Sequence, residues 1–227
     1  MTLRGIVFDF DGVIADSESL HFKGYRDVLA EEGVVLTQAE YLARYLGYDD
    51  VGAFETIAAD TGRRWSSEHV TRLVERKAVR LEALARDHSP LFPGAAAAIT
   101  RLSATCPLAI ASGALRAEIT HVLEREGLSR YFAAVVGAED VAASKPAPEP
   151  YLKAIRALAA DQEPQARHFV AIEDSRWGLA SARAAGLRTV AITHTYPASQ
   201  LDADLTVSNL DSLSTEILEN LVQNVLD

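Results

Sequence analysis

Short, unbroken apolar runs recur along the chain, and each is typical of a strand that is buried on both faces. They cover residues 5–10, 107–112, 133–138, 168–174, 187–193 and 204–207. Because these runs do not alternate apolar with polar positions, they favour a parallel sheet covered on both sides. Helix-length segments at 113–128 and 175–187 lie between the later runs, and both carry a glycine typical of a helix stop. The pattern therefore predicts an α/β core with helices on both faces of the sheet.

Residues 16–87 do not follow this alternation of strand-like runs and helical segments. Four amphipathic segments follow one another there with no strand-like run between them: 19–33, 36–47, 49–62 and 67–87. Apolar residues three or four apart predict helices for each segment. We therefore expect a parallel-sheet, Rossmann-like core of residues 1–15 and 88–227 with an inserted α-helical cap domain of residues 16–87. Hinges are expected near 14–17 and 86–93, where Pro90, Pro93 and Gly94 mark a linker.

Two aspartates, Asp9 and Asp11, stand where the first apolar run ends. By itself this pattern also fits a strand that enters a polar turn, since Asp-Gly is a common turn pair. Side chains two apart on a strand point to the same side, so both carboxylates can face one site. Their repulsion costs free energy unless a cation lies between them or one is protonated. Either arrangement suits a pair in which one carboxylate is a nucleophile or metal ligand and the other moves a proton.

A second acidic pair, Glu173 and Asp174, ends the run at 168–174. In parallel sheets ligands bind beyond the carboxyl ends of the strands, so the two acidic pairs can meet at one edge. Alternatively, Glu173 and Asp174 cap the helix that is predicted to begin near Arg176, because acidic groups favour helix N-termini.

Two further segments carry residues suited to phosphate binding. Ser112 and Gly113 follow the run at 107–112, where a glycine lets the backbone approach an anion and a helix N-terminus presents amides. Ser112 as a simple N-cap fits equally well. Lys145, before Pro146, is either a solvated surface charge or the counter-charge of a phosphoryl group.

Composition and charge narrow the possible partners. The chain has 227 residues, 48% of them hydrophobic, and a net charge of −10, so binding to nucleic acid has no electrostatic support. Cys106 is the only cysteine, which excludes an intrachain disulfide and fits a reducing compartment. The N-terminus offers too short an apolar stretch for a signal peptide or a membrane span. We expect a cytoplasmic protein without a membrane partner, and nothing in the sequence demands more than a monomer.

In order, "DFDGVIADSE", "ASG", "SKPAPEP" and "IEDS" resemble the four motifs of the haloacid dehalogenase superfamily, in its Mg²⁺-dependent phosphatase and phosphomutase branch. The resemblance covers essentially the whole chain, including the helical insertion. It implies that Asp9 is the nucleophile and becomes an aspartyl phosphate. Asp11 then protonates the leaving oxygen and activates the water or hydroxyl that discharges the intermediate.

The resemblance also implies a metal site and a phosphate site. Mg²⁺ is expected on the Asp9 carboxylate, the Asp11 main-chain carbonyl and Asp174, with Glu173 as a ligand or close by. The phosphoryl oxygens are expected to bind Ser112, Lys145 and the amides of Gly113 and Ala114. The superfamily's dehalogenases act without the metal and lack an aspartate at the place of Asp11, which argues against that activity.

Within the superfamily, the sequence is similar to β-phosphoglucomutase and to related sugar-phosphate phosphatases. The resemblance places His21 near the hinge and Lys77 among substrate contacts of the cap, although a packed or solvated histidine and a plain helix-surface lysine also fit. The mutase has an arginine in its cap loop that grips the second phosphate, whereas this loop has Asp49 and Asp50, and Arg44 lies one helical turn earlier.

Two acids in that loop would repel a second phosphate. We therefore expect a phosphatase that acts on a small phosphorylated metabolite, either a sugar phosphate or a phosphoglycolate-like compound. A phosphomutase is the alternative. A non-catalytic regulatory protein on the same fold is a remote one, because such proteins usually lose Asp9 or Asp11, and both are present.

Overall fold

The computed structural model describes residues 2–45, 48, 50–87, 89–159 and 163–223. The chain divides into two compact units. One, the core unit, contains Met1–Asp16 and Leu91–Asp227, and the other, the inserted helical unit, is Ser17–Pro90. The unit boundaries lie within three residues of the predicted domain boundaries, and residue 88 of the second predicted hinge lies outside the described residues.

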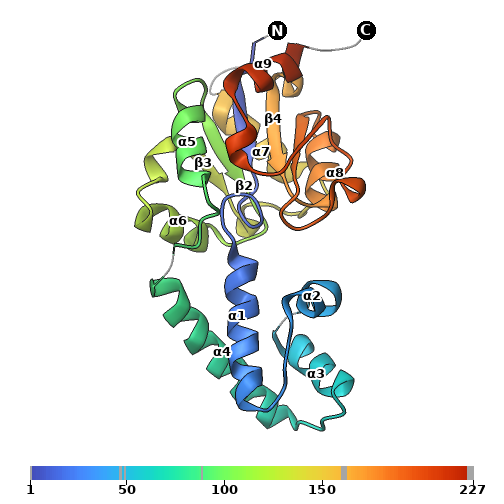
Figure 1. The fold of residues 1–227 in the computed structure, drawn as a ribbon. Helices are drawn as coiled ribbons and strands as arrows, with labels where there is room; N and C mark the ends of the chain where they lie inside the picture. Colours follow the sequence, from blue (N-terminus) through green and yellow to red (C-terminus); the bar gives the residue numbers. More distant parts are fainter. Residues whose placement is uncertain (1, 46–47, 49, 88, 160–162, 224–227) are drawn as a thin grey trace. The chain divides into compact units, whose positions relative to one another are not determined.

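A six-stranded parallel sheet forms the centre of the core unit (Figure 1). Its strands are β1 (Gly5–Phe8), β2 (Leu108–Ala111), β3 (Phe132–Val136), β4 (Phe169–Glu173), β5 (Arg188–Ile192) and β6 (Leu205–Val207). Their order is β3-β2-β1-β4-β5-β6, and each falls within or next to a predicted apolar run. The prediction of an α/β parallel sheet is confirmed.

Helices cover both faces of this sheet (Figure 1). They are α5 (Ala95–Ser103), α6 (Arg116–Arg125), α7 (Glu149–Ala159), α8 (Arg176–Ala184) and α9 (Thr215–Gln223). Buried residues of α5, α6 and α9 pack with Phe8 and Ile172 on one face, whereas those of α7 and α8 pack with Val7 and Ala171 on the other. Neighbouring strand residues thus face opposite cores, which explains why the strands lack a polar side.

Short 3₁₀ turns complete the core unit: η2 (Ser129–Tyr131), η3 (Ala138–Asp140), η4 (Ala166–His168), η5 (Ala198–Gln200) and η6 (Leu210–Ser212).

The inserted helical unit contains α1 (Ser17–Glu31), α2 (Gln38–Glu40), the π-helical turn η1 (Tyr41–Tyr45), α3 (Asp50–Asp60) and α4 (Ser67–Asp87). Its core includes Tyr25, Tyr41 and Phe54, which are buried together between these helices. The expected helix at 36–47 begins at Gln38, after a capping box between Thr37 and Glu40, and continues from Tyr41 as a wider, π-helical turn. Residues 46 and 47 lie outside the described residues.

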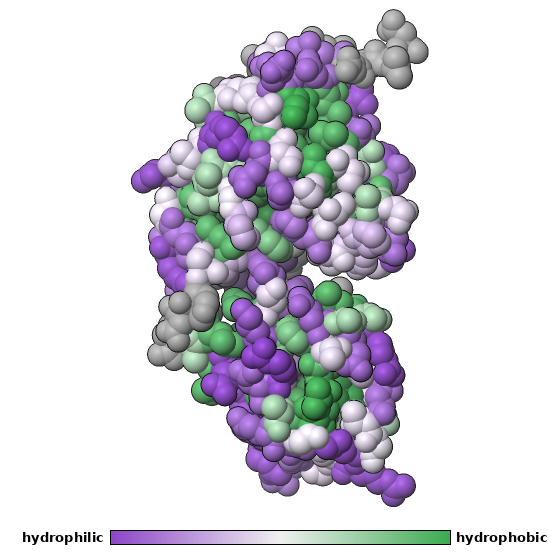
Figure 2. All heavy atoms as spheres, in the orientation of Figure 1, coloured by the Kyte–Doolittle hydropathy of each residue, from purple (hydrophilic) through white to green (hydrophobic). Residues whose placement is uncertain are grey.

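Hydrophilic and apolar residues are mixed on the surface of each unit that Figure 2 shows. The exposed large apolar side chains include Val51 on α3, Val79 on α4 and Trp177 on α8. They are scattered over separate elements, which is ordinary for a protein surface. None of the helices in the described residues has the length and apolar character that crossing a bilayer requires.

Candidate active site

The register of three neighbouring strands brings the predicted motifs together at one edge of the sheet. Phe8 of β1 lies beside Ile110 of β2 and Ile172 of β4. The Asp9 amide continues this pairing, because it donates to the Ile172 carbonyl at 2.9 Å. Asp9 is therefore level with the end of β4, where Glu173 and Asp174 follow, as the sequence predicted.

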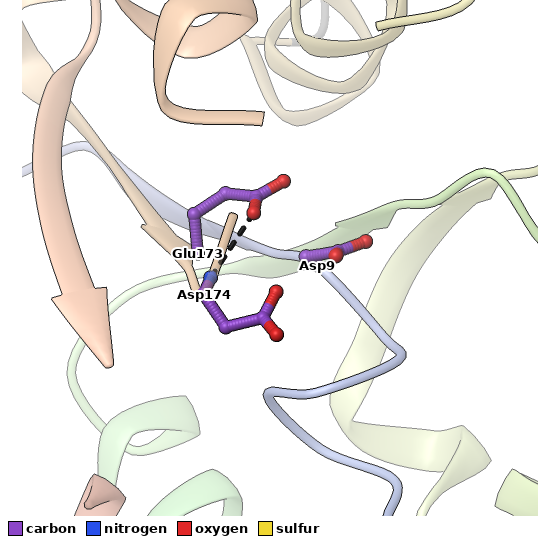
Figure 3. A group of neighbouring side chains, drawn as sticks. All are labelled: Asp9, Glu173 and Asp174. Atoms are coloured by element: carbon purple, nitrogen blue, oxygen red, sulfur yellow. Dashed lines mark hydrogen bonds between the residues drawn. The ribbon is translucent and has the colours of Figure 1, made fainter. Parts of the chain in front are cut away.

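Three carboxylates gather at this edge. Oxygens of Asp9, Glu173 and Asp174 lie within 4.8 Å of one another, and all three residues are buried (Figure 3). Burial, followed by the charge of Glu173, raises the pKa of Asp9 well above its ordinary value. The same two causes raise the pKa of Asp174 to about 7. The cluster thus carries a large electrostatic cost when it is fully ionised.

Lys145 is the cation of this cluster. Its ammonium lies 2.9 Å from the Asp9 carboxylate and 2.5 Å from Glu173. Although burial lowers the pKa of Lys145, the two carboxylates raise it above its ordinary value, so the ammonium stays charged. The alternative of a solvated surface lysine is therefore wrong.

The side chain of Glu173 is held by five hydrogen bonds. One oxygen accepts from Lys145 and from the Tyr151 phenol, and the other accepts from the amides of Asp174 and Ser175 and from the Ser175 hydroxyl. The bond from the Asp174 amide, 3.0 Å long, is the dashed line in Figure 3. Each oxygen of Glu173 is thus already saturated by donors, which suits a residue that orients Lys145.

The N-cap of α8 is Ser175, because its hydroxyl accepts from the Gly178 amide at 3.0 Å. Capping of this helix by Glu173 or Asp174 therefore does not explain the second acidic pair. The two carboxylates point into the cluster instead (Figure 3).

Two glycines allow the backbone to approach the acids closely. A β-carbon on Gly12 would lie 1.9 Å from a carboxylate oxygen of Asp174, and one on Gly178 would lie 1.6 Å from Glu173. Gly12 also has a φ of +78°, which side-chain-bearing residues rarely adopt. A side chain at either position would therefore require the Asp174 or Glu173 carboxylate to move.

The predicted phosphate-binding turn follows β2. Ser112 is buried, and its hydroxyl accepts from the Ala114 amide at 3.1 Å. Because α6 begins only at Arg116, Ser112 is not the N-cap of that helix. Gly113 is exposed, and a β-carbon there would meet nothing within 4 Å, so the backbone is open to an approaching anion.

Asp11 lies in a turn directly after β1. It forms a bridge with Ala15, and the Gly12 amide donates to the Ala15 carbonyl at 2.9 Å. Asp11 is half-buried, in contrast to Asp9. The two aspartates of the first motif thus have different surroundings, as different chemical roles require.

Sequence reasoning missed three residues at this edge. Tyr151 of α7 reaches Glu173, whereas Thr195 donates from its hydroxyl to Asp174 and His194 contacts the Gly12 carbonyl. A signal for the last two was present, because both follow β5 at the same carboxyl edge of the sheet. Nothing in the sequence distinguishes Tyr151 from an ordinary buried helix residue.

The residues present fit a Mg²⁺ ion. Three carboxylates are buried together beside the Lys145 ammonium, and burial, followed by the charge of Glu173, raises the pKa of both Asp9 and Asp174. A hard divalent cation prefers carboxylate oxygens and needs few of them. The donor set therefore suits the metal that the resemblance implies.

The inserted helical unit contains a second buried charge cluster. Lys77 is 0% exposed and forms an ion pair with Asp50. Its ammonium also donates to His21 Nδ1 at 3.1 Å and lies 4.1 Å from the centre of the Tyr25 ring. The expectation of a plain helix-surface lysine is wrong, because the side chain points into the helical unit. His21 is packed against this cluster rather than fully solvated.

These contacts correct the charge argument for the loop before α3. The Asp50 carboxylate is neutralised by Lys77 and accepts from the Tyr25 phenol at 2.7 Å, so it is not a free anion. Asp49 lies outside the described residues. Arg44, in turn, forms an ion pair of 2.6 Å with Asp60 within the same unit. The Arg44 guanidinium, a candidate ligand for a second phosphate, therefore already has an anionic partner.

Comparison with known proteins gives a consistent result. Haloacid dehalogenase-like hydrolases match residues 6–192. Protein CbbY of Rhodobacter capsulatus is 31% identical over 97% of this chain and 100% of its own length. Hexitol phosphatase B of Escherichia coli (strain K12) is 29% identical over 93% of this chain and 95% of its own length.

A solved structure of β-phosphoglucomutase from Clostridium difficile aligns with a TM-score of 0.69 at 20% identity, and the alignment covers 98% of each chain. At this identity the likeness concerns the fold alone. The family match spans all four motifs that meet at the sheet edge, and this chain belongs to the haloacid dehalogenase-like hydrolases.

Proposed function

We propose that this protein is a Mg²⁺-dependent phosphatase that hydrolyses the phosphoric monoester of a small metabolite through an aspartyl phosphate on Asp9. The observation that carries the proposal is the contact of 2.9 Å between the Lys145 ammonium and the Asp9 carboxylate, beside Asp174. A nucleophile, a phosphate counter-charge and a metal ligand thus meet at one point. Positioning and charge stabilisation of this kind do most of the work in phosphoryl transfer.

The reaction takes two steps. A carboxylate oxygen of Asp9 attacks phosphorus, the ester bond breaks, and the Asp11 carboxyl gives its proton to the leaving oxygen. Asp11, now ionised, takes a proton from water, whose oxygen attacks the aspartyl phosphate and releases inorganic phosphate. Asp9 is regenerated as a carboxylate and Asp11 as an acid, so the cycle closes.

The metal would be held by the carboxylates of Asp9 and Asp174 and by the Asp11 main-chain carbonyl. When bound, Mg²⁺ supplies positive charge that offsets the clustered carboxylates and the phosphoryl oxygens. We assign Glu173 to a supporting role, because its oxygens accept five hydrogen bonds and one of them holds Lys145. Lys145, the Ser112 hydroxyl and the amides of Gly113 and Ala114 would bind the phosphoryl oxygens.

A sugar phosphate or a phosphoglycolate-like compound is the proposed substrate class. The relatives support a phosphatase, since one of them is named hexitol phosphatase B. The fold does not separate phosphatase from mutase, because a β-phosphoglucomutase shares it. Against the mutase, Arg44 is paired with Asp60, so a second phosphate would have to compete with that carboxylate for the guanidinium.

The test is phosphate release and ³¹P NMR with Mg²⁺ and a panel of a hexitol phosphate, several sugar phosphates and phosphoglycolate. We expect inorganic phosphate from at least one compound, and no turnover by Asp9→Asn. The matched control is Asp202→Asn, the same change at a carboxylate that is 86% exposed on the core unit. Glucose 6-phosphate formed from β-glucose 1-phosphate without free phosphate would mean a mutase. Turnover by a clean Asp9→Asn preparation would exclude Asp9 as the nucleophile.

A further inference from the structure

His194 lies in the loop after β5 and contacts two separate segments of the core unit. Its Nδ1 is 2.9 Å from the main-chain carbonyl oxygen of Gly12. Because a carbonyl oxygen only accepts, Nδ1 carries the hydrogen and donates it. Its ring also stacks on Phe92, with 3.9 Å between the ring centres and 23° between the planes. The imidazole is thus fixed in both position and rotation.

The first of these segments is the turn that carries Asp11. Gly12 follows Asp11 directly, and its place is narrow, since a β-carbon there would clash with Asp174. The turn is closed at its far end by the bond from the Gly12 amide to Ala15. His194 holds the Gly12 carbonyl, which belongs to the next peptide unit, so each of the two peptide units that flank Gly12 is fixed by a hydrogen bond.

The second segment is the returning connection at Leu91 and Phe92. The Phe92 amide donates to the Ile14 carbonyl at 3.0 Å, and Leu91 pairs with Ala15. This hydrogen bond and this bridge join the returning connection to the Asp11 turn. His194 contacts the same two segments through its ring face and its Nδ1, and so links both of them to the end of β5.

We propose that His194 is a positioning residue that holds the Asp11 carboxyl in line with the leaving oxygen, through the Gly12 carbonyl and the stack on Phe92. This inference rests on the proposed acid–base role of Asp11. Without the bond to Gly12, the turn can rotate about Asp11 while Asp9, Lys145 and the phosphate site stay in place. The predicted defect is therefore in proton transfer to the leaving group rather than in phosphate binding.

Two substrates separate these defects. An alkyl phosphate such as β-glycerol phosphate needs a proton on its leaving oxygen, whereas 4-nitrophenyl phosphate releases a stable phenolate without one. The kcat/KM of each reports the steps up to formation of the aspartyl phosphate. A misplaced acid lowers kcat/KM for the alkyl ester selectively, while general damage to the site lowers both alike.

For His194→Ala we expect kcat/KM for β-glycerol phosphate to fall about ten- to a hundredfold. The value for 4-nitrophenyl phosphate and the inhibition constant of inorganic phosphate should change less than about threefold in the same variant. His194→Asn keeps an N–H at the position of Nδ1, so it should restore most of the alkyl-ester activity. His121→Ala, the same deletion at an exposed histidine of α6, should match the parent protein.

An equal loss with both substrates, or an Asn variant no better than the Ala variant, would overturn the role of His194. If His194→Ala does not fold, Phe92→Leu keeps the hydrogen bond and apolar volume but removes the stack. Phe92→Leu should then lower the ratio of kcat/KM for β-glycerol phosphate to kcat/KM for 4-nitrophenyl phosphate. An unchanged ratio would overturn the inference.

Asp11→Asn, measured in parallel, separates this inference from the proposed function. If Asp11→Asn leaves alkyl-ester hydrolysis intact, the acid–base role itself is wrong, and the inference fails with it. If Asp11→Asn selectively lowers kcat/KM for the alkyl ester but His194→Ala does not, only the inference about His194 fails. Because His194 would act through Asp11, adding His194→Ala to Asp11→Asn should cause no further selective loss.

Discussion

The Tyr151 phenol donates a hydrogen bond of 3.0 Å to Glu173, and to the same carboxylate oxygen that accepts from Lys145. Both Tyr151 and Glu173 are completely buried. The Lys145 ammonium lies 5.1 Å from the centre of the Tyr151 ring as well. Tyr151 therefore fixes the carboxylate that fixes the lysine, and it does so from α7, on the face of the sheet opposite α5, α6 and α9.

Tyr151→Phe should weaken this arrangement without removing any group from the proposed reaction. Loss of a buried hydrogen bond to an ionised carboxylate is expected to lower the free energy of unfolding by about 1.5–3 kcal/mol. Affinity for inorganic phosphate should fall too, because Lys145 is less firmly oriented. Urea denaturation and phosphate inhibition measure the two effects. Tyr131→Phe is the control, since its phenol accepts a hydrogen bond from the exposed Arg130, and an equal loss there would contradict the assigned role of Tyr151.

Gly12→Ala and Gly178→Ala should each abolish most activity, because the added methyl group would overlap a carboxylate of the cluster. Gly12→Ala also incurs backbone strain of roughly 1–2 kcal/mol. Gly127→Ala separates the two effects, since Gly127 has a φ of +69° but an added β-carbon there would meet nothing within 4 Å. Full activity in Gly127→Ala with loss in Gly12→Ala would assign the defect to displacement of Asp174. An active Gly12→Ala enzyme would show that the turn tolerates a different position of Asp174.

The sequence was informative wherever function depends on strand ends. Asp9, Ser112 and Glu173 each lie at the end of an apolar run, and the parallel order of β2, β1 and β4 brings those ends together. Tyr151 and His194 could not be assigned, because their roles depend on the packing of α7 and on the path of the loop after β5.

The sequence also does not predict which charged side chains form ion pairs. Lys77 and Asp50 are 27 residues apart. Their meeting inside the helical unit depends on how α3 packs on α4, which amphipathic periodicity does not specify. The pairing of Arg44 with Asp60 likewise depends on how η1 packs on α3, which the sequence does not specify.

The ion pair between Lys77 and Asp50 predicts an asymmetric response to substitution. Asp50→Asn leaves a wholly buried ammonium without its counter-charge and should lower the free energy of unfolding by about 3–5 kcal/mol. Lys77→Met leaves a carboxylate that is 35% exposed and still bound by Tyr25, so the loss should be smaller, roughly 1–2 kcal/mol.

Both variants are made in a protein that also carries Trp177→Phe, and their urea unfolding is followed by tryptophan fluorescence. Trp65, which packs on Phe54, then reports on the helical unit alone. Lys153→Met, which removes a partly exposed ion pair with Glu149, is the control and should cost at most about 1 kcal/mol. Equal losses for Asp50→Asn and Lys77→Met would contradict the burial of Lys77.

The pKa of Asp174 predicts how the metal-free protein responds to pH. Burial and the charge of Glu173 raise this pKa from 3.8 to about 7, so between these values the folded protein binds a proton that the unfolded chain has lost. The free energy of unfolding that this group contributes is therefore greatest at low pH and falls as the pH rises through that window. Asp9, whose pKa is also raised, acts in the same direction.

Mg²⁺ should reverse this trend, because a metal ligand must lose its proton before it binds. We expect the rise in Tm caused by Mg²⁺ to be larger near pH 8 than near pH 6, and proton release on binding at the lower pH. Asp174→Asn should remove both the metal response and part of the pH dependence, whereas Asp202→Asn, which changes an exposed carboxylate paired with Arg183, should keep them. A metal-induced rise in Tm that is equal at both pH values, or that persists in Asp174→Asn, would place the ion elsewhere.

Because Asp174 supports no chemical step in the proposed reaction other than through the metal, Asp174→Asn should lose activity in proportion to its loss of Mg²⁺ affinity. Partial recovery of turnover at high Mg²⁺ concentration would agree with that role, and an activity loss that no Mg²⁺ concentration relieves would require a second function for Asp174.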